Sequence, residues 1–218
     1  VNPDVISLNE NRNSTMQSVA STLRTQTGEP WAAYWLDRGD GDGVGIMTKH
    51  EYVQLGILRF ANWIKYRRVA LAGQITHRTT RKRVTFITTH LVAPESVESG
   101  STAVRVLQAA ELEGWARQFA EPRLVAGDLN EDRRYANAID NELIPYYYDG
   151  WEEAVKKEAA TGQEVAVAEY SDGRTRPTTR LDYILYSRSA SGVTLRETRV
   201  WPMLYSDHRA VSCIFEFR

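Results

Sequence analysis

The stretch Arg123-Leu-Val-Ala-Gly-Asp-Leu-Asn130 joins a short apolar run to two polar side chains. An apolar run of this length, bounded by a glycine, is typical of a strand buried in a sheet. Asp128 and Asn130 follow directly, so the carboxyl end of the strand predicted over 123–126 carries groups that bind metal ions or orient water. On its own, Asp128 after Gly127 is equally well explained as a turn-forming residue.

The same arrangement recurs along the chain. Glu10 follows the apolar run 4–8, His90 lies near the end of the run 84–91, and Asp182 lies in the run 181–186. Asp207 and His208 precede the alternating run 210–217. Taken singly, each has a structural explanation, such as a surface acid, a satisfied core histidine or a capping group. Their recurrence at strand ends predicts that they gather in one site.

The pattern of elements predicts the fold class. Apolar positions at helical spacing predict helices that begin at Ser14 or Thr15 and end at Gly28, and others over 102–119 and 151–160. The strands predicted from short apolar or alternating runs cover 4–8, 31–36, 44–47, 68–75, 84–91, 123–126, 181–186, 192–200 and 210–217. Many strands with few helices and little βαβ alternation favour an α/β fold of two packed mixed sheets flanked by helices.

Length and composition limit the architecture. The chain has 218 residues, of which 42% are hydrophobic, which suits one domain with its own core. No apolar run approaches the ~20 residues that span a bilayer, so we expect no integral membrane segment. The single cysteine, Cys213, excludes an intrachain disulfide. This fits both a cytoplasmic and a secreted protein, and the sequence leaves location and oligomeric state open.

Charge gives no general signal for nucleic acid. The chain carries 27 basic and 28 acidic residues, a net charge of −1, so any such binding must use a local patch. The clearest patch is Arg78-Thr-Thr-Arg-Lys-Arg83, in the turn of a predicted hairpin. Arg81 and Lys82 are therefore candidate substrate-binding residues, with a solvated turn as the alternative.

The candidate side chains suit hydrolysis of a phosphoester. This reaction needs charge neutralised on the nonbridging oxygens, a positioned water and help for the departing oxygen. Carboxylates and imidazoles supply these functions. A glutamate with further carboxylates suits Mg²⁺ or Mn²⁺, whereas one cysteine and dispersed histidines do not form a structural zinc site.

Five local motifs resemble those of the endonuclease/exonuclease/phosphatase superfamily, which has the deoxyribonuclease I-like fold, and they occur in its order. They are Asn2-Pro-Asp-Val-Ile-Ser-Leu-Asn-Glu10, Thr88-Thr-His-Leu91, Val125-Ala-Gly-Asp-Leu-Asn130, Arg180-Leu-Asp-Tyr-Ile184 and Ser206-Asp-His-Arg209. The resemblance covers essentially the whole chain, including the spacing of Arg105 and Gln108. It implies a four-layer α/β/β/α sandwich in which residues 1–218 form a single catalytic domain. It also implies that an opening strand and helix of the family precede this segment.

The resemblance assigns roles to the candidate residues. Glu10 would be the principal metal ligand, with Asp207 at or near the metal. His208 would contact the scissile phosphate, and Asp182 would fix its tautomer and favour its charged form. The remaining catalytic candidates are His90, which would donate to a phosphate oxygen, and Asp128 with Asn130, which would orient water or assist the leaving group.

The expected activity is that of a metal-dependent phosphodiesterase, specifically a nuclease acting on DNA. Two alternatives stay open. One is a phosphomonoesterase or a phospholipid or inositol-phosphate hydrolase, although the Trp-Cys-Asp-Arg signature of inositol phosphatases is absent. The other is a binding domain that has kept the scaffold and lost catalysis.

Overall fold

The computed structural model describes residues 2–94, 99–134, 138–168, 173–202 and 206–218. Its strands form one six-stranded and two three-stranded sheets. The six-stranded sheet has the order β4 (Glu51–Arg59), β5 (Val69–Thr76), β6 (Arg83–His90), β7 (Arg123–Asp128), β10 (Asp182–Ser187) and β8 (Tyr147–Asp149). The first small sheet has the order β1 (Val5–Asn11), β3 (Gly43–Thr48) and β2 (Ala32–Asp37), and the second β12 (Val211–Phe217), β11 (Val193–Val200) and β9 (Ala166–Val167).

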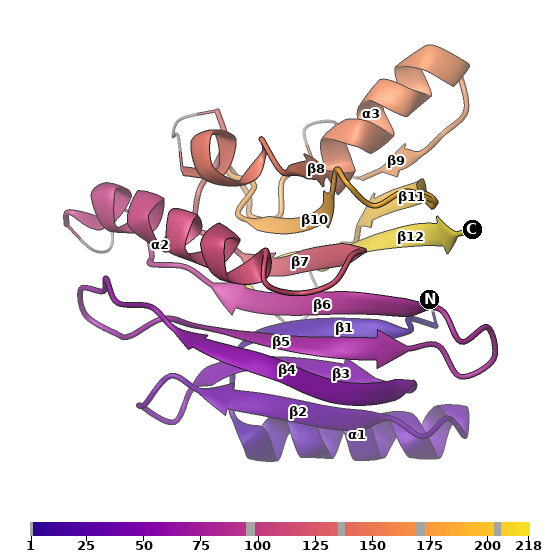
Figure 1. Ribbon diagram of the computed structural model, residues 1–218, viewed down its shortest axis with the longest axis horizontal. Coiled ribbons are helices and arrows are strands. Elements are labelled where there is room, and N and C mark those ends of the chain that lie inside the picture. Colours follow the sequence, from indigo (N-terminus) through magenta and orange to yellow (C-terminus); the bar gives the residue numbers. More distant parts are fainter. Residues whose placement is uncertain (1, 95–98, 135–137, 169–172, 203–205) are drawn as a thin grey trace.

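These elements stack as a layered sandwich (Figure 1). Helix α1 (Asn13–Thr27) covers the outer face of the β1–β3–β2 sheet, and α2 (Ser101–Ala116) covers the outer face of the six-stranded sheet. Helix α3 (Gly150–Thr161) packs against β10 of the large sheet and β11 of the second small sheet. The predicted α/β/β/α arrangement is confirmed, with the refinement that one sheet layer consists of two separate sheets.

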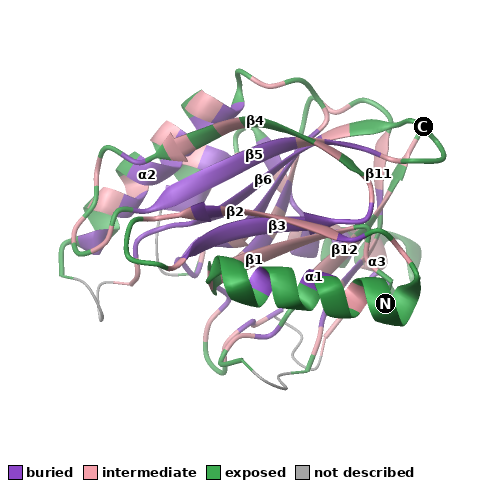
Figure 2. Cartoon of the chain, turned by 90° about the horizontal axis from the view of Figure 1, so that it is seen from below, coloured by how far each residue is buried: buried purple, intermediate pink, exposed green. Residues whose placement is uncertain are grey.

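Apolar side chains fill the spaces between the layers. Ile46 of β3 and Leu71 and Phe86 of the large sheet belong to the cluster between the sheets, and the partly buried Phe215 of β12 packs against the same cluster. Only one stripe of α1 is buried, as Figure 2 shows for this helix, and it includes Met16. This amphipathic pattern explains why the sequence predicted α1 with nearly correct ends. Gly28 ends the helix in the left-handed conformation, with φ of 71°.

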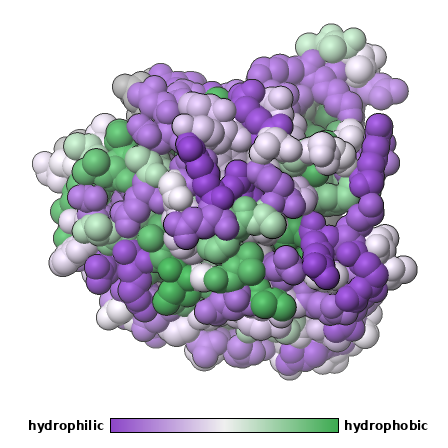
Figure 3. All heavy atoms as spheres, in the orientation of Figure 1, coloured by the Kyte–Doolittle hydropathy of each residue, from purple (hydrophilic) through white to green (hydrophobic). Residues whose placement is uncertain are grey.

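Strand β4 was not predicted from the sequence. A β-bulge at Leu55 interrupts its pairing with β5, so the strand lacks a continuous alternation of apolar and polar residues. Val53 and Ile57 are 60% and 46% exposed, and Figure 3 shows hydrophobic atoms on the surface over this edge strand. The short strands β8 and β9 and the π-helical turn Ile139–Leu143 were also not predicted.

The layer that holds the small sheets is interrupted between β1 and β12. Within the described residues β1 pairs only with β3, and β12 pairs only with β11. β1 packs over β6 and β7, whereas β12 packs over β10, the next strand of the large sheet. The expectation that an opening strand and helix precede this segment stays a prediction. No helix among the described residues combines the length and apolar character needed to cross a membrane.

Candidate active site

Sheet topology brings four predicted residues to one end of the sandwich. β6 and β7 are parallel, so their last residues His90 and Asp128 are register partners. β10 runs antiparallel to β7, which pairs its first residue, Asp182, with Asp128. His208 lies in the segment before β12 and reaches Asp182. Neighbouring strand ends therefore assemble the group that the sequence pattern predicted.

His208 is held between two carboxylates. Its Nδ1 lies 2.7 Å from Oδ2 of Asp182, and its Nε2 lies 4.0 Å from Oδ2 of Asp128. Burial opposes the charged ring, but the hydrogen bond and charge of Asp182 outweigh it and raise the pKa of His208 above its usual value. The contact also fixes Nδ1 as the donor to Asp182, which leaves Nε2 directed toward Asp128.

Asp128 is almost fully buried at the centre of the site. Burial, assisted by the neighbouring charge of Asp182, raises its pKa to about 7, although His208 works in the opposite direction. Its Oδ1 accepts the backbone N–H of Asn130 at 2.8 Å, and the Asn130 side chain donates to the Leu91 carbonyl at 3.0 Å. Asp128 and Asn130 thus form one hydrogen-bonded unit with the end of β6.

His90 is buried between a cation and the acids of the site. Nη1 of Arg68 lies 3.2 Å from each ring nitrogen of His90. Burial first, and then the charge of Arg68, hold the pKa of His90 well below its usual value, so the ring is neutral. Its Nε2 lies 3.7 Å from Asp128, and its Nδ1 lies 3.9 Å from Oε1 of Glu10.

The backbone at the site is constrained. Glu10 and Asn130 have φ of 52° and 54°, in a region that non-glycine residues rarely occupy. Such conformations persist only where surrounding contacts impose them. Position 127, directly before Asp128, requires a glycine. A Cβ there would lie 1.9 Å from the carbonyl oxygen of Thr89 on neighbouring β6.

The structure does not bring every predicted residue into this cluster. The Asp207 carboxylate is exposed and pairs with Nη2 of Arg176 at 2.7 Å. Arg81 and Lys82 lie in the turn between β5 and β6, at the opposite end of β6 from His90, and Arg81 pairs with Glu51. β6 has eight residues, which separates its ends by about 23 Å. Arg81 and Lys82 therefore cannot contact the same phosphate as His90.

Sequence reasoning missed Arg68 and Thr175. Thr175 Oγ1 accepts the backbone N–H groups of Leu181 and Asp182 at 3.0 and 3.2 Å, which fixes the start of β10. Arg68 stood out in the sequence only as a charged residue directly before an apolar run, a signal shared by many solvated strand ends. Its buried contact with His90 depends on the pairing of β5 with β6, which the sequence pattern does not display.

The donor groups fit a hard divalent cation. One carboxylate oxygen each of Asp128 and Asp182 and one ring nitrogen of His208 lie within 4.8 Å of one another, although Nδ1 of His208 already donates to Asp182. The Glu10 carboxylate is 66% exposed at the same end of the sandwich. Carboxylate oxygens with only one or two imidazoles suit Mg²⁺ or Mn²⁺ better than a soft metal ion.

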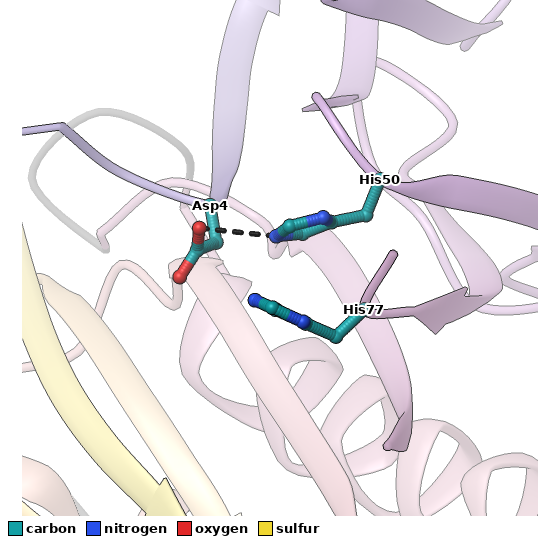
Figure 4. Close-up of side chains that lie close together, drawn as sticks. All are labelled: Asp4, His50 and His77. Carbon is teal, nitrogen blue, oxygen red and sulfur yellow. Dashed lines mark hydrogen bonds and ion pairs between the residues drawn. The ribbon is translucent and has the colours of Figure 1, made fainter. Parts of the chain in front are cut away.

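A second cluster of similar residues, drawn in Figure 4, consists of Asp4, His50 and His77. It lies at the other end of the sandwich, because Asp4 precedes β1 whereas Glu10 lies near the end of that strand. Oδ1 of Asp4 lies 3.0 Å from Nε2 of His50 and 3.2 Å from Nζ of Lys49. The ring of His77 lies 4.3 Å from that of His50. Nδ1 of His77 accepts the backbone N–H of Thr80, so the proton of the neutral ring is on Nε2. That proton and the ammonium group of Lys49 make the cluster a poor metal site.

Solved structures similar to this chain show the same fold. An endonuclease/exonuclease/phosphatase from Bacteroides vulgatus is 15% identical, with a TM-score of 0.73 over 99% of this chain and 85% of its own. The human Nocturnin catalytic domain with bound sulfate is 18% identical, with a TM-score of 0.69 over 99% and 82%. A mannosyl-6-phosphatase from Bacteroides thetaiotaomicron is 15% identical, with a TM-score of 0.69 over 98% and 85%.

No curated protein matches the sequence. The profile of one family, however, matches residues 1–208, which include Glu10, His90, Asp128, Asp182 and His208. This match supports phosphoester hydrolysis as the reaction. The chain therefore belongs to the Endonuclease/Exonuclease/phosphatase family.

Proposed function

We propose that this protein is a divalent-metal-dependent phosphodiesterase, and more narrowly a nuclease that acts on DNA. The observation that carries the proposal is the orientation of His208. Asp182 holds Nδ1 at 2.7 Å, and Nε2 is directed toward Asp128 beside His90 and Asn130. An imidazole fixed at one nitrogen presents the other to a substrate phosphate in a single tautomer.

The protein side chains divide the work of hydrolysis. His208, kept charged by Asp182, would donate a hydrogen bond to a nonbridging phosphate oxygen. Neutral His90 would donate a second one, backed by the positive charge of Arg68. Asp128 has a pKa of about 7, close to the range in which a group accepts a proton from water or returns one to a leaving oxygen. Asn130 would help to orient that water.

Glu10, with Asp207, would hold the Mg²⁺ or Mn²⁺ ion. When bound, the ion supplies positive charge that offsets the charge developing on the phosphate. The exposed carboxylate of Glu10 supports this assignment. Asp207 pairs with Arg176 through one carboxylate oxygen, Oδ2, and its other oxygen would be the one to bind the ion.

The principal alternative is hydrolysis of a phosphomonoester or of a phospholipid or inositol phosphate. The structural likeness to a mannosyl-6-phosphatase makes a monoester substrate a specific candidate to test. A catalytically inactive binding domain is the alternative from another class. The contact between His208 and Asp182 argues against it, since a domain without chemistry has no need of a partly buried imidazole fixed in one tautomer.

A single set of assays separates these functions. Purified protein is incubated with supercoiled plasmid, bis-p-nitrophenyl phosphate, p-nitrophenyl phosphate and phospholipid vesicles, each with Mg²⁺, with Mn²⁺ and with EDTA. We expect metal-dependent nicking of the plasmid and cleavage of the diester. Turnover of the monoester or lipid alone would replace the nuclease assignment, and turnover of none of them would favour the binding domain.

A further inference from the structure

The loop between β4 and β5, residues 60–68, borders the candidate active site. It ends at Arg68, whose guanidinium contacts His90. Its other end is fixed to α2, because the Asn62 carbonyl accepts from Gln108 at 2.7 Å and the Ala61 N–H donates to the Glu111 carboxylate. Gln108 in turn accepts the N–H of Val92, two residues beyond His90. The loop is therefore attached to the segment that carries a catalytic candidate.

Exposure alternates along this loop. Trp63, Lys65 and Arg67 are exposed, whereas Asn62, Ile64 and Tyr66 are partly buried. The ring of Tyr66 makes cation–π contacts with Cζ of Arg38 at 4.9 Å and Nζ of Lys65 at 5.1 Å from its centre. Trp63 is 51% exposed and makes no aromatic or cation–π contact with the described residues. The flat indole of Trp63 is thus exposed to solvent in the same loop as the exposed cations Lys65 and Arg67.

We propose that Trp63, Lys65 and Arg67 form a platform that binds unpaired bases of a nucleic acid strand next to the reaction centre. The indole would stack on a base, and the two cations would contact the backbone phosphates on either side. Residues 60–69 contain three cations and no acid, although the chain as a whole has a net charge of −1. Aromatic stacking combined with local positive charge is how proteins bind single strands without reading their sequence.

The position of the platform favours nucleic acid over a small phosphoester. A small ester is held at the reaction centre itself. It has no second group that could reach the indole of Trp63, which lies farther from His90 along the loop than Arg68. A polynucleotide extends past the scissile phosphate, so its next base can reach the loop that carries Trp63. Exposed tryptophan and lysine also occur at membrane surfaces, so binding to lipid is the outcome that would contradict this inference.

The test measures binding without catalysis. The proposal rests on the proposed function, and EDTA separates the two because it removes the metal ion that hydrolysis needs. Fluorescence anisotropy with a labelled single-stranded oligonucleotide gives the dissociation constant of each variant. We expect Trp63→Ala to weaken binding about tenfold and Trp63→Phe to restore most of it. Lys65→Gln should lower the slope of log Kd against log salt by about 0.7.

The matched control is Val53→Ala on strand β4, a 60% exposed apolar residue outside the loop, which should bind as the wild type does. Unchanged binding by Trp63→Ala would overturn the platform. So would a Trp63→Ala defect in sedimentation with anionic vesicles combined with normal oligonucleotide binding. Wild-type cleavage of bis-p-nitrophenyl phosphate is measured in parallel with Mg²⁺. Its absence would contradict the proposed function, whereas its presence with unaltered Trp63→Ala binding would contradict only the platform.

Discussion

At one end of the sandwich His208 donates from Nδ1 to a carboxylate, whereas at the other end His77 accepts a backbone N–H at the same ring nitrogen. Both ends contain histidine and aspartate side chains close enough to share a ligand. The end with the candidate active site leaves an imidazole nitrogen directed at buried Asp128. The other end directs both imidazoles at Asp4, which Lys49 already neutralises. The two clusters therefore differ in the hydrogen bonds around them rather than in their residue types, and we expect catalysis only at the end that holds His208.

The sharpest test of this contrast replaces one histidine at each end. We expect His208→Ala to lower kcat about a thousandfold, because it removes a positioned donor to the phosphate. His50→Ala should leave kcat within a factor of about two.

Because Asp182 acts through His208, the effects of Asp182→Asn and His208→Ala on kcat should not combine multiplicatively. Steady-state kinetics on bis-p-nitrophenyl phosphate measures all of these variants, and a double mutant that loses the product of both factors would show that the two residues act independently.

A second test compares carboxylates at the two ends. Glu10→Gln should raise the Mg²⁺ concentration for half-maximal activity at least about tenfold, because the amide is a weaker ligand than the carboxylate. Asp4→Asn should leave the metal response unaltered. Titration of activity with Mg²⁺ after EDTA treatment gives both values. A wild-type metal response in Glu10→Gln would remove Glu10 from the ion site.

The pH dependence of the reaction gives a third, smaller effect. The pKa of His208 is raised, so its charged form persists to higher pH than that of a free histidine and is lost as pH rises through the raised value. Activity that needs the charged ring should fall on the alkaline side. In Asp182→Asn this fall should move to lower pH, since the partner that favours the charge is gone. A pH profile of kcat/KM checks the direction, and an unmoved alkaline limb would show that His208 does not act as an imidazolium.

The smallest effect is expected on stability at the other end. Although partial burial opposes ionisation of Asp4, His50 and Lys49 lower its pKa. This carboxylate therefore stabilises the fold above its ordinary pKa of about 4, and the contribution is lost as pH falls through the lowered value. Asp4 is more than half exposed, so Asp4→Asn should cost at most about 1 kcal/mol at neutral pH. Urea unfolding at pH 7 measures this cost, and a loss of several kcal/mol would show that the cluster is a structural anchor.

The sequence predicted which residues of the candidate site lie together better than it predicted their surroundings. His90, Asp128 and Asp182 sit at the ends of regular apolar runs, and strand pairing places such ends together. The contrast between the two ends was beyond the sequence, because His50 and His77 lie at turns whose proximity depends on the register of β4 with β5. The position of Arg81 and Lys82, in contrast, follows from the sequence, because the strand predicted over 84–91 already separates their turn from His90.

The residues of the candidate site come from three different sheets. Glu10 is carried by β1 of one small sheet, whereas His208 lies just before β12 of the other. Asp128 and Asp182 lie on neighbouring strands of the large sheet. The distance between Glu10 and His208 therefore depends on how each small sheet packs on the large one, and spin labels on β3 and β11 would follow that packing in solution.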